Sequence, residues 1–185
     1  MVRRIVVKVT GKLFDDENAA ELLRGLSEII KARVEGGYRF AVVVGGGRRA
    51  REYIAIGRKL GLSEGILDVL GIEVSRVNAL LLASAMGPRA YLPIPRGIDE
   101  FMEAWSSGRV VVVGGMQPGQ STNAVAAAVA ELVGADLLVN ATDVAGVYDS
   151  DPRKSPGARL LGEVSVGGLE SMLSGGDVAG SYELF

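Results

Sequence analysis

Two valine-rich runs that each end in glycines place the strongest constraint on the fold. Residues 40–44 (Phe-Ala-Val-Val-Val) lead into three glycines at 45–47, and residues 110–113 lead into Gly114 and Gly115. Apolar runs without polar alternation are typical of parallel strands that are covered on both faces. Segments with helical spacing of apolar residues separate them. We therefore expect an α/β fold, a three-layer αβα sandwich with a mainly parallel central sheet.

The remaining segments fit the same alternation. Asn18 or Asp16 can cap the first helix, and Gly61 can end the second. The predicted strands are residues 5–9, 40–44, 90–93, 110–113 and 137–141. The predicted helices are residues 19–35, 50–60, 67–86, 98–105 and 123–133, with a helical piece near 168–173. Ligands of such sheets bind at the carboxyl ends of the strands, which is where the glycine loops fall.

Composition narrows the chemistry that is available. The 185 residues include no cysteine and no histidine, which excludes disulfides, thiolate metal sites and the usual general base. We predict no metal site built by the protein itself, so a metal would have to be recruited. The net charge of −2 and the lack of a long basic tract argue against nucleic-acid binding. No apolar run reaches about 18 residues, so we expect no membrane span and a soluble, cytoplasmic protein.

The glycine loops suggest phosphate binding. Glycine lets backbone N–H groups approach an anion closely, and Arg51 adds a permanent positive charge one helical turn after residues 45–47. Residues 114–122 repeat the arrangement in altered form, where Ser121 and Thr122 open a helix whose N-terminus attracts anions. The alternatives are a tight turn for the glycines and a simple N-cap for Ser121 or Thr122. Neither a P-loop nor a dinucleotide-binding glycine motif occurs.

Three charged side chains stand among apolar residues or next to glycine. Lys8 lies at the end of the first strand, where burial of the ammonium group is costly unless an anion meets it. The alternative for Lys8 is an edge strand with its side chain in solvent, and solvent exposure has more weight for Lys12 in the following loop. Asp68 lies in an apolar segment, where it either caps a helix or accepts hydrogen bonds from sugar hydroxyls.

The segment after the last predicted strand is more specific. Residues 142–148 (Thr-Asp-Val-Ala-Gly-Val-Tyr), followed by Asp-Pro-Arg at 151–153, resemble the adenine-nucleotide loop of the amino acid kinase superfamily. Ala145 replaces the aspartate that is usual in that loop. Together with residues 8–12, 45–47, 51, 68, 71–79 and 114–122, the chain resembles the archaeal type of uridylate kinase over essentially its whole length. The Gly-Gly-x-x-Pro-Gly-x-Ser/Thr-Thr loop is the most discriminating part.

The resemblance implies a role for each motif residue. Lys8 would act at the transferring phosphoryl group, with Lys12 as the second catalytic lysine. The residues that would bind ATP are Gly11, Lys12, Gly47, Arg51, Thr142, Asp143, Tyr148 and Asp151. The residues that would bind UMP are Gly46, Asp68, Met116, Gln117, Pro118, Gly119, Gln120, Ser121 and Thr122. In the second set, Asp68 would hold the ribose hydroxyls.

The resemblance also implies an activity. The γ-phosphoryl group of ATP, which carries Mg²⁺, would pass to UMP and give UDP and ADP in pyrimidine nucleotide biosynthesis. UMP already has an ionised phosphate, so the absence of histidine is compatible with this reaction. The same absence argues against the related isopentenyl phosphate kinases, and the Pro-Gly-x-Ser/Thr-Thr loop argues against acetylglutamate and aspartate kinases. A non-catalytic relative that binds a nucleotide or an oxyanion is the remaining alternative.

Regulation and assembly complete the expectations. A pocket for uracil and ribose beside a phosphate channel should admit UTP as a feedback inhibitor, and the family resemblance implies a homohexamer built as a trimer of dimers. We expect one amino acid kinase domain over residues 1–185, with an acceptor lobe at about 1–115 and an ATP lobe at about 116–185. In the family, the stretch near Phe185 leads into an aspartate, a helix, a final strand and a hairpin. We therefore expect a longer natural protein, and a missing loop near residues 174–177.

Overall fold

The computed structural model describes residues 2–150, 154–168 and 171. The chain divides into two compact units, Met1–Ala141 and Thr142–Phe185. The first unit contains the sheet and the helices that cover it. The second contains residues 142–148, which resemble the adenine-nucleotide loop of the amino acid kinase superfamily. The predicted lobe boundary near residue 115 stays a prediction. Among the helices of the described residues, none combines the length and apolar character needed to cross a membrane.

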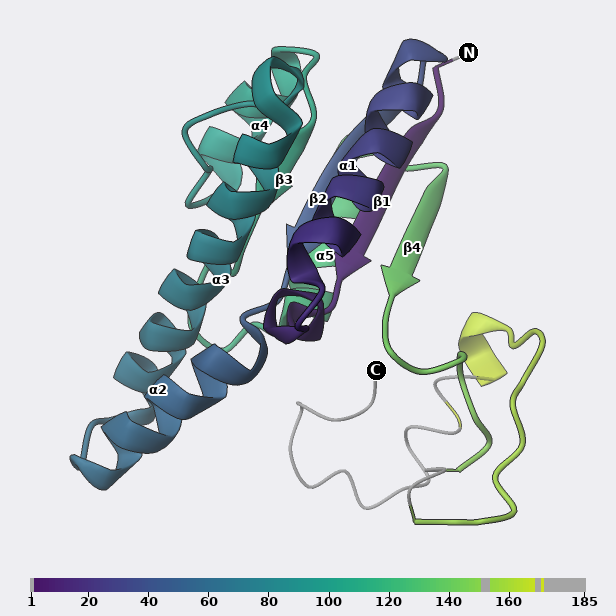
Figure 1. The fold of residues 1–185 in the computed structure, drawn as a ribbon. Coiled ribbons are helices and arrows are strands. Elements are labelled where there is room, and N and C mark those ends of the chain that lie inside the picture. The colour runs from purple at the N-terminus through teal and green to yellow at the C-terminus, as the bar shows by residue number, and fades with distance from the viewer. Residues whose placement is uncertain (1, 151–153, 169–170, 172–185) are drawn as a thin grey trace. The chain divides into compact units, whose positions relative to one another are not determined.

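A parallel sheet forms the centre of the first unit (Figure 1). In spatial order, its strands are β3 (Val111–Val113), β2 (Arg39–Val44), β1 (Arg4–Val9) and β4 (Leu137–Ala141). Every neighbouring pair runs parallel, and Val9 lies beside Val44 of β2 and Ala141 of β4. The carboxyl ends of all these strands therefore lie along one edge of the sheet.

The direction of the connections places the helices on two faces. The helical elements are α1 (Ala19–Glu35), α2 (Gly47–Lys59), α3 (Glu64–Met86), α4 (Ile98–Ser106) and α5 (Thr122–Val133), with 3₁₀ helices η1 (Gly11–Asp15) and η2 (Gly87–Arg89). The crossovers from β1 to β2 and from β2 to β3 each move one strand along the sheet in the same direction. The crossover from β3 to β4 runs the opposite way, past β2 and β1. Because such crossovers are right-handed, α1 and α3 lie on one face and α5 on the other.

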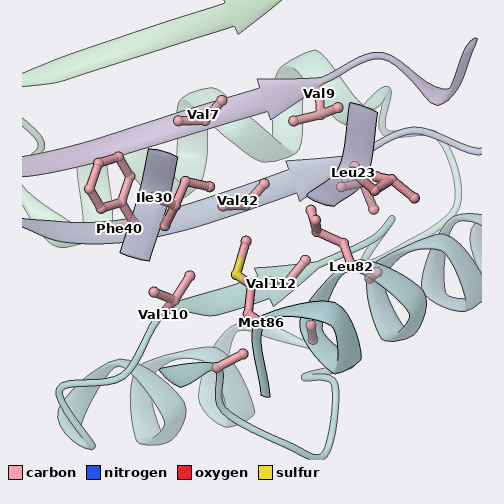
Figure 2. Close-up of a cluster of buried hydrophobic side chains, with 14 of the residues drawn as sticks. Val7, Val9, Leu23, Ile30, Phe40, Val42, Leu82, Met86, Val110 and Val112 are labelled. Atoms are coloured by element: carbon pink, nitrogen blue, oxygen red, sulfur yellow. The ribbon is translucent and has the colours of Figure 1, made fainter. Parts of the chain in front are cut away.

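Alternate strand residues fill the two cores between the layers. Figure 2 shows the first core, in which strand residues meet α1 and α3, namely Val7, Val42 and Val112 with Leu23, Ile30, Leu82 and Met86. The second core, on the opposite face, joins the strands to α4 and α5 through Val6, Val43, Val111, Phe101, Trp105, Val125 and Val129. Both sets are buried. The predicted three-layer αβα sandwich with a parallel sheet is confirmed.

Arg39 fastens the amino-terminal edge of the sheet to α4. Its guanidinium carbon lies 4.0 Å from the centroid of the Trp105 ring, and its Nη2 atom donates to the Trp105 carbonyl oxygen. Burial, together with the positive charge of Arg4, lowers the pKa of Arg39. Arg4 in turn donates its backbone N–H to Oδ2 of Asp136 at 2.8 Å, just before β4. These contacts lie at the edge of the sheet opposite the glycine loops.

Most of the predicted elements are confirmed, with shifted ends. Helices α2 and α3 begin three residues earlier than the apolar spacing indicated. The strand predicted at residues 90–93 is wrong, because Ala90 forms only an isolated bridge with Val110. Pro93 and Pro95 follow, and proline has no N–H to continue a ladder. The helical piece predicted near 168–173 lies largely outside the described residues.

Candidate active site

Three loops meet at the carboxyl edge of the sheet in the first unit. Helix η1 follows β1, the glycines at 45–47 follow β2, and the start of α5 lies beyond β3. A Cβ atom on Gly45 would lie 3.0 Å from the backbone nitrogen of Gly11 and 3.7 Å from Oγ1 of Thr122. The structure thus brings together residues from three separate sequence motifs that were predicted to bind phosphate.

Lys8 is buried beside these loops. Strand β1 lies between β2 and β4, where Lys8 is the register partner of Val43 and Asn140. Lys8 shares the face of β1 with Val6, and its side chain is therefore on the side of α5. Its exposure of 7% rules out the alternative of a solvent-facing lysine on an edge strand. Lys12, in contrast, is exposed in η1, and its backbone nitrogen donates to Oγ1 of Thr10 at 3.5 Å.

The N-terminus of α2 is joined to η1 by a carboxylate. Gly47 opens α2 with φ +69°, a conformation that favours glycine. The next N–H group, that of Arg48, donates to Oδ2 of Asp15. Asp15 was not predicted as a site residue, because the sequence does not show that η1 packs against α2. Arg51 lies one turn further along α2 and is exposed.

Asp68 is linked to the loop that was predicted to wrap the acceptor. It lies five residues into α3, whose N-cap is Ser63, so the alternative of a helix-capping role is wrong. Its Oδ2 atom accepts a hydrogen bond from the backbone nitrogen of Gly119 at 2.8 Å. Gly119 has φ +79°, which favours glycine at that position. The structure therefore joins Asp68 and Gly119, two residues that the resemblance assigned to the same ligand.

The loop after β3 packs tightly against α3. A Cβ atom on Gly114 would lie 2.6 Å from Oγ of Ser75, and one on Gly115 would lie 2.8 Å from Cγ1 of Ile72. Arg76 donates from Nη2 to the Met116 carbonyl oxygen at 3.3 Å, and from Nη1 to Oε1 of its neighbour Glu73 at 2.6 Å. No role was predicted for Ser75 and Arg76, because their partners Gly115 and Met116 are 40 residues away in the sequence.

Helix α5 begins at the end of this loop. Oγ of Ser121 accepts a hydrogen bond from the backbone nitrogen of Ala124 at 3.2 Å, so the predicted N-cap is confirmed for Ser121. Thr122 is the first residue of the helix, and its Oγ1 atom would lie 3.7 Å from a Cβ atom on Gly45. The intervening loop residues Gln117, Pro118 and Gln120 are exposed. The positive end of the α5 dipole therefore points toward the glycine loops.

The second unit contains the predicted adenosine loop. Thr142 and Tyr148 are half-buried, Asp143 is exposed, and Asp151 lies outside the described residues. Tyr148 forms an antiparallel bridge with Leu160. Beside it, Asp149 accepts a hydrogen bond from the backbone nitrogen of Arg159 at 2.8 Å. This bond and a second one from the Arg159 side chain together lower the pKa of Asp149. Residues 147–149 of this loop thus pair with residues 159–161 within the second unit.

The chemical groups of the first unit suit phosphate transfer between bound anions. Glycine amides, a buried lysine and a helix N-terminus all present positive charge at one edge of the sheet. In the part of the chain that the structure describes, no group of three or more His, Cys, Asp or Glu side chains could hold a metal ion.

Known proteins resemble the chain over nearly all of its length. The model of the amino acid kinase family matches residues 3–184. The uridylate kinases of Metallosphaera sedula and Sulfolobus acidocaldarius are each 50% identical over 98% of this chain and 80% of their own length. A crystal structure of uridylate kinase from Archaeoglobus fulgidus is 39% identical, with a TM-score of 0.84 over 92% of this chain and 78% of that chain.

A parallel sheet with glycine loops along its carboxyl edge is typical of α/β proteins that bind nucleotides at that edge. The chain belongs to the amino acid kinase family, and within that family it is similar to the uridylate kinases of archaea.

Proposed function

We propose that the chain is a UMP kinase, an ATP-dependent phosphotransferase. The observation that carries the proposal is the meeting of three loops beside the buried Lys8. It is made in a chain that is 50% identical to two uridylate kinases. In this reaction a phosphate oxygen of UMP attacks the γ-phosphorus of ATP. The bond between the γ-phosphorus and the β,γ-bridging oxygen breaks, and its electrons stay with ADP.

Lysines, backbone amides and Mg²⁺ suffice for this chemistry. Phosphoryl transfer needs alignment of the two nucleotides and positive charge around the moving group, and it needs little covalent participation by the protein. We assign Lys8 the role of stabilising charge on the transferring phosphoryl group, and Lys12 in η1 is the second catalytic lysine. The phosphate of UMP is already ionised, so the reaction proceeds without a histidine base, in keeping with a sequence that has none.

We divide the nucleotide contacts between two groups of residues. UMP would be bound by Gly46, Asp68 and residues 116–122, and the link between Asp68 and Gly119 supports their common role. ATP would be bound by Gly11, Lys12, Gly47, Arg51, Thr142, Asp143, Tyr148 and Asp151. Within the first unit, the contact between the Gly11 and Gly47 backbones supports the phosphate part of that second group.

Mg²⁺ would enter as a part of the ATP substrate. Mg²⁺ keeps several waters and is commonly bound by phosphates with only one or two carboxylates. The described residues offer no ready cluster of ligands for it, which fits a metal carried by the nucleotide. We further propose feedback inhibition by UTP, a cytoplasmic location, a role in pyrimidine nucleotide biosynthesis and a homohexamer built as a trimer of dimers.

A turnover assay tests the function directly. The protein is incubated with ATP and Mg²⁺ and with UMP, CMP, isopentenyl phosphate or acetylglutamate, and ADP is measured. We expect turnover with UMP well above that with the other acceptors. ADP formation that does not depend on UMP, or a preference for another acceptor, would overturn the proposal. Binding of nucleotides without any turnover would favour the non-catalytic alternative.

A further inference from the structure

Two buried polar side chains lie on the face of α3 that meets the sheet. Ser75 is 2% exposed and Asn78 is 4% exposed, and Ala79 and Leu82 continue the same face into the first core. A buried amide or hydroxyl is costly unless it is hydrogen-bonded. Because an apolar residue would pack this face at lower cost, the bonds that these two side chains make are informative.

Each side chain bonds to a different glycine loop. Nδ2 of Asn78 donates to the carbonyl oxygen of Gly45 at 2.8 Å. Oγ of Ser75 accepts from the backbone nitrogen of Gly115 at 2.7 Å and donates to the carbonyl oxygen of Ile72 at 2.6 Å. Residues three apart on a helix lie on one face. One turn of α3 therefore holds the loop after β2 and the loop after β3 at a fixed separation.

The bond from Asn78 also sets the direction of a neighbouring amide. The peptide between Gly45 and Gly46 is trans, so its N–H group points opposite to its carbonyl group. With the Gly45 oxygen held toward α3, the Gly46 N–H is directed away from α3. Glycine has no Cβ to restrict rotation of such a peptide, so the orientation depends on this hydrogen bond.

From this geometry we infer that Ser75 and Asn78 are positioning residues for the acceptor nucleotide. Asn78 orients the amide of Gly46, and Ser75 anchors the start of the loop that runs through Met116 to Thr122. The inference rests on the proposed function, since it names the UMP side of that site. Neither side chain needs to touch the nucleotide, because both act through the backbone of the loops.

Two substitutions separate positioning from general stability. Asn78→Asp keeps the size of the side chain but replaces the donor with an oxygen that repels the Gly45 carbonyl. Ser75→Ala removes only the oxygen that accepts from Gly115. Ser27→Ala is the matched control, because Ser27 is 1% exposed and its hydroxyl donates only within α1, to Leu23 at 2.8 Å.

The measurements are kcat, the KM of each nucleotide and the melting temperature. Loss of a buried hydrogen bond that orients a ligand-binding amide should raise the KM for UMP by about tenfold or more. The KM for ATP should change by less than about twofold. Ser27→Ala should lower the melting temperature without changing the ratio of the two KM values. Isothermal titration with UMP alone should show the same weakening.

The outcomes are distinct. If both variants fold and keep the wild-type KM for UMP, or raise both KM values equally, the positioning role is wrong. If Asn78→Asp does not fold, Ser75→Ala, which removes one atom, decides the matter with the same criteria. A wild-type protein that neither phosphorylates nor binds UMP would instead overturn the proposed function.

Discussion

Gly11 and Gly47 lie so close together that a Cβ atom on Gly11 would be 2.0 Å from the backbone nitrogen of Gly47. The approach is mutual, since a Cβ atom on Gly47 would be 2.5 Å from the Gly11 carbonyl oxygen. Real Cβ atoms do not approach backbone atoms this closely, so neither position accepts a side chain without movement of a loop. The loops after β1 and β2 therefore form one surface built of backbone.

Gly11→Ala tests that surface. The new methyl group must push the two loops apart, which should destabilise the fold by about 1–3 kcal/mol and abolish most kinase activity. Gly25→Ala is the control, because a Cβ atom at exposed Gly25 in α1 meets nothing within 4 Å. That change should stabilise the protein by about 0.5–1 kcal/mol. Unfolding curves and turnover are measured, and a fully active Gly11→Ala enzyme would contradict the close contact.

Lys8→Ala tests the charge at the transferring phosphoryl group. Removing a positive group that acts mainly in the transition state should lower kcat by about a hundredfold or more, with little change in the KM for UMP. Lys31→Ala removes a lysine that pairs with Glu28 on α1 and should leave kcat unchanged. Near-normal kcat in Lys8→Ala, with the control intact, would show that Lys8 has no catalytic role.

Substitutions of Asp68 distinguish its charge from its contact with Gly119. Asp68→Asn keeps an oxygen that can accept from Gly119, whereas Asp68→Ala removes it. If the carboxylate accepts the ribose hydroxyls, Asp68→Asn should raise the KM for UMP and narrow the preference for UMP over deoxyuridine monophosphate. Asp68→Ala should add a loss of loop order and raise that KM further. An unchanged ratio of the two substrates in Asp68→Asn would leave Asp68 with a purely structural role.

UTP should inhibit by occupying the acceptor site. Its uracil and ribose would lie where those of UMP bind, and its additional phosphates would extend along the glycine loops. Inhibition should then be competitive with UMP in initial-rate kinetics at several UMP concentrations. Noncompetitive inhibition would place UTP at a separate site.

Arg39→Ala should affect stability without affecting catalysis. It removes the contact with the Trp105 ring and the hydrogen bond to the Trp105 carbonyl, which together should stabilise the fold by about 1–3 kcal/mol. Both contacts lie at the edge of the sheet opposite the proposed site, so kcat and KM should be unchanged. Arg24→Ala is the control for loss of an arginine, because Arg24 is an exposed residue of α1. A large fall in kcat for folded Arg39→Ala would contradict this separation.

The sheet and its glycine loops could be predicted from local sequence. Continuous runs such as residues 40–44 and 110–113 allow little besides buried strands, and glycines at their ends indicate close backbone contact. The predicted strand at 90–93 failed because apolar character was given more weight than the missing donors of Pro93 and Pro95.

Asp15, Ser75 and Asn78 could not be predicted in the same way. Each bonds to a backbone group that is distant in sequence, such as Arg48 for Asp15 and Gly45 for Asn78. A serine or asparagine in an apolar helix indicates only that some partner is needed. Which partner it finds depends on where α3 lies against the sheet, and that follows from the packing of the whole unit.

The order of strands in the sheet has a consequence for how the protein is made. Strand β1 pairs with β2, which follows it closely in the chain, and with β4, which is the last of the four to be synthesised. Domains emerge from the ribosome N-terminal end first. The contact between the Gly11 and Gly47 loops can thus form early, while the other side of β1 has no strand beside it until β4 emerges. During that interval the growing chain exposes an open, valine-rich edge, which is the stage at which a chaperone would protect it most.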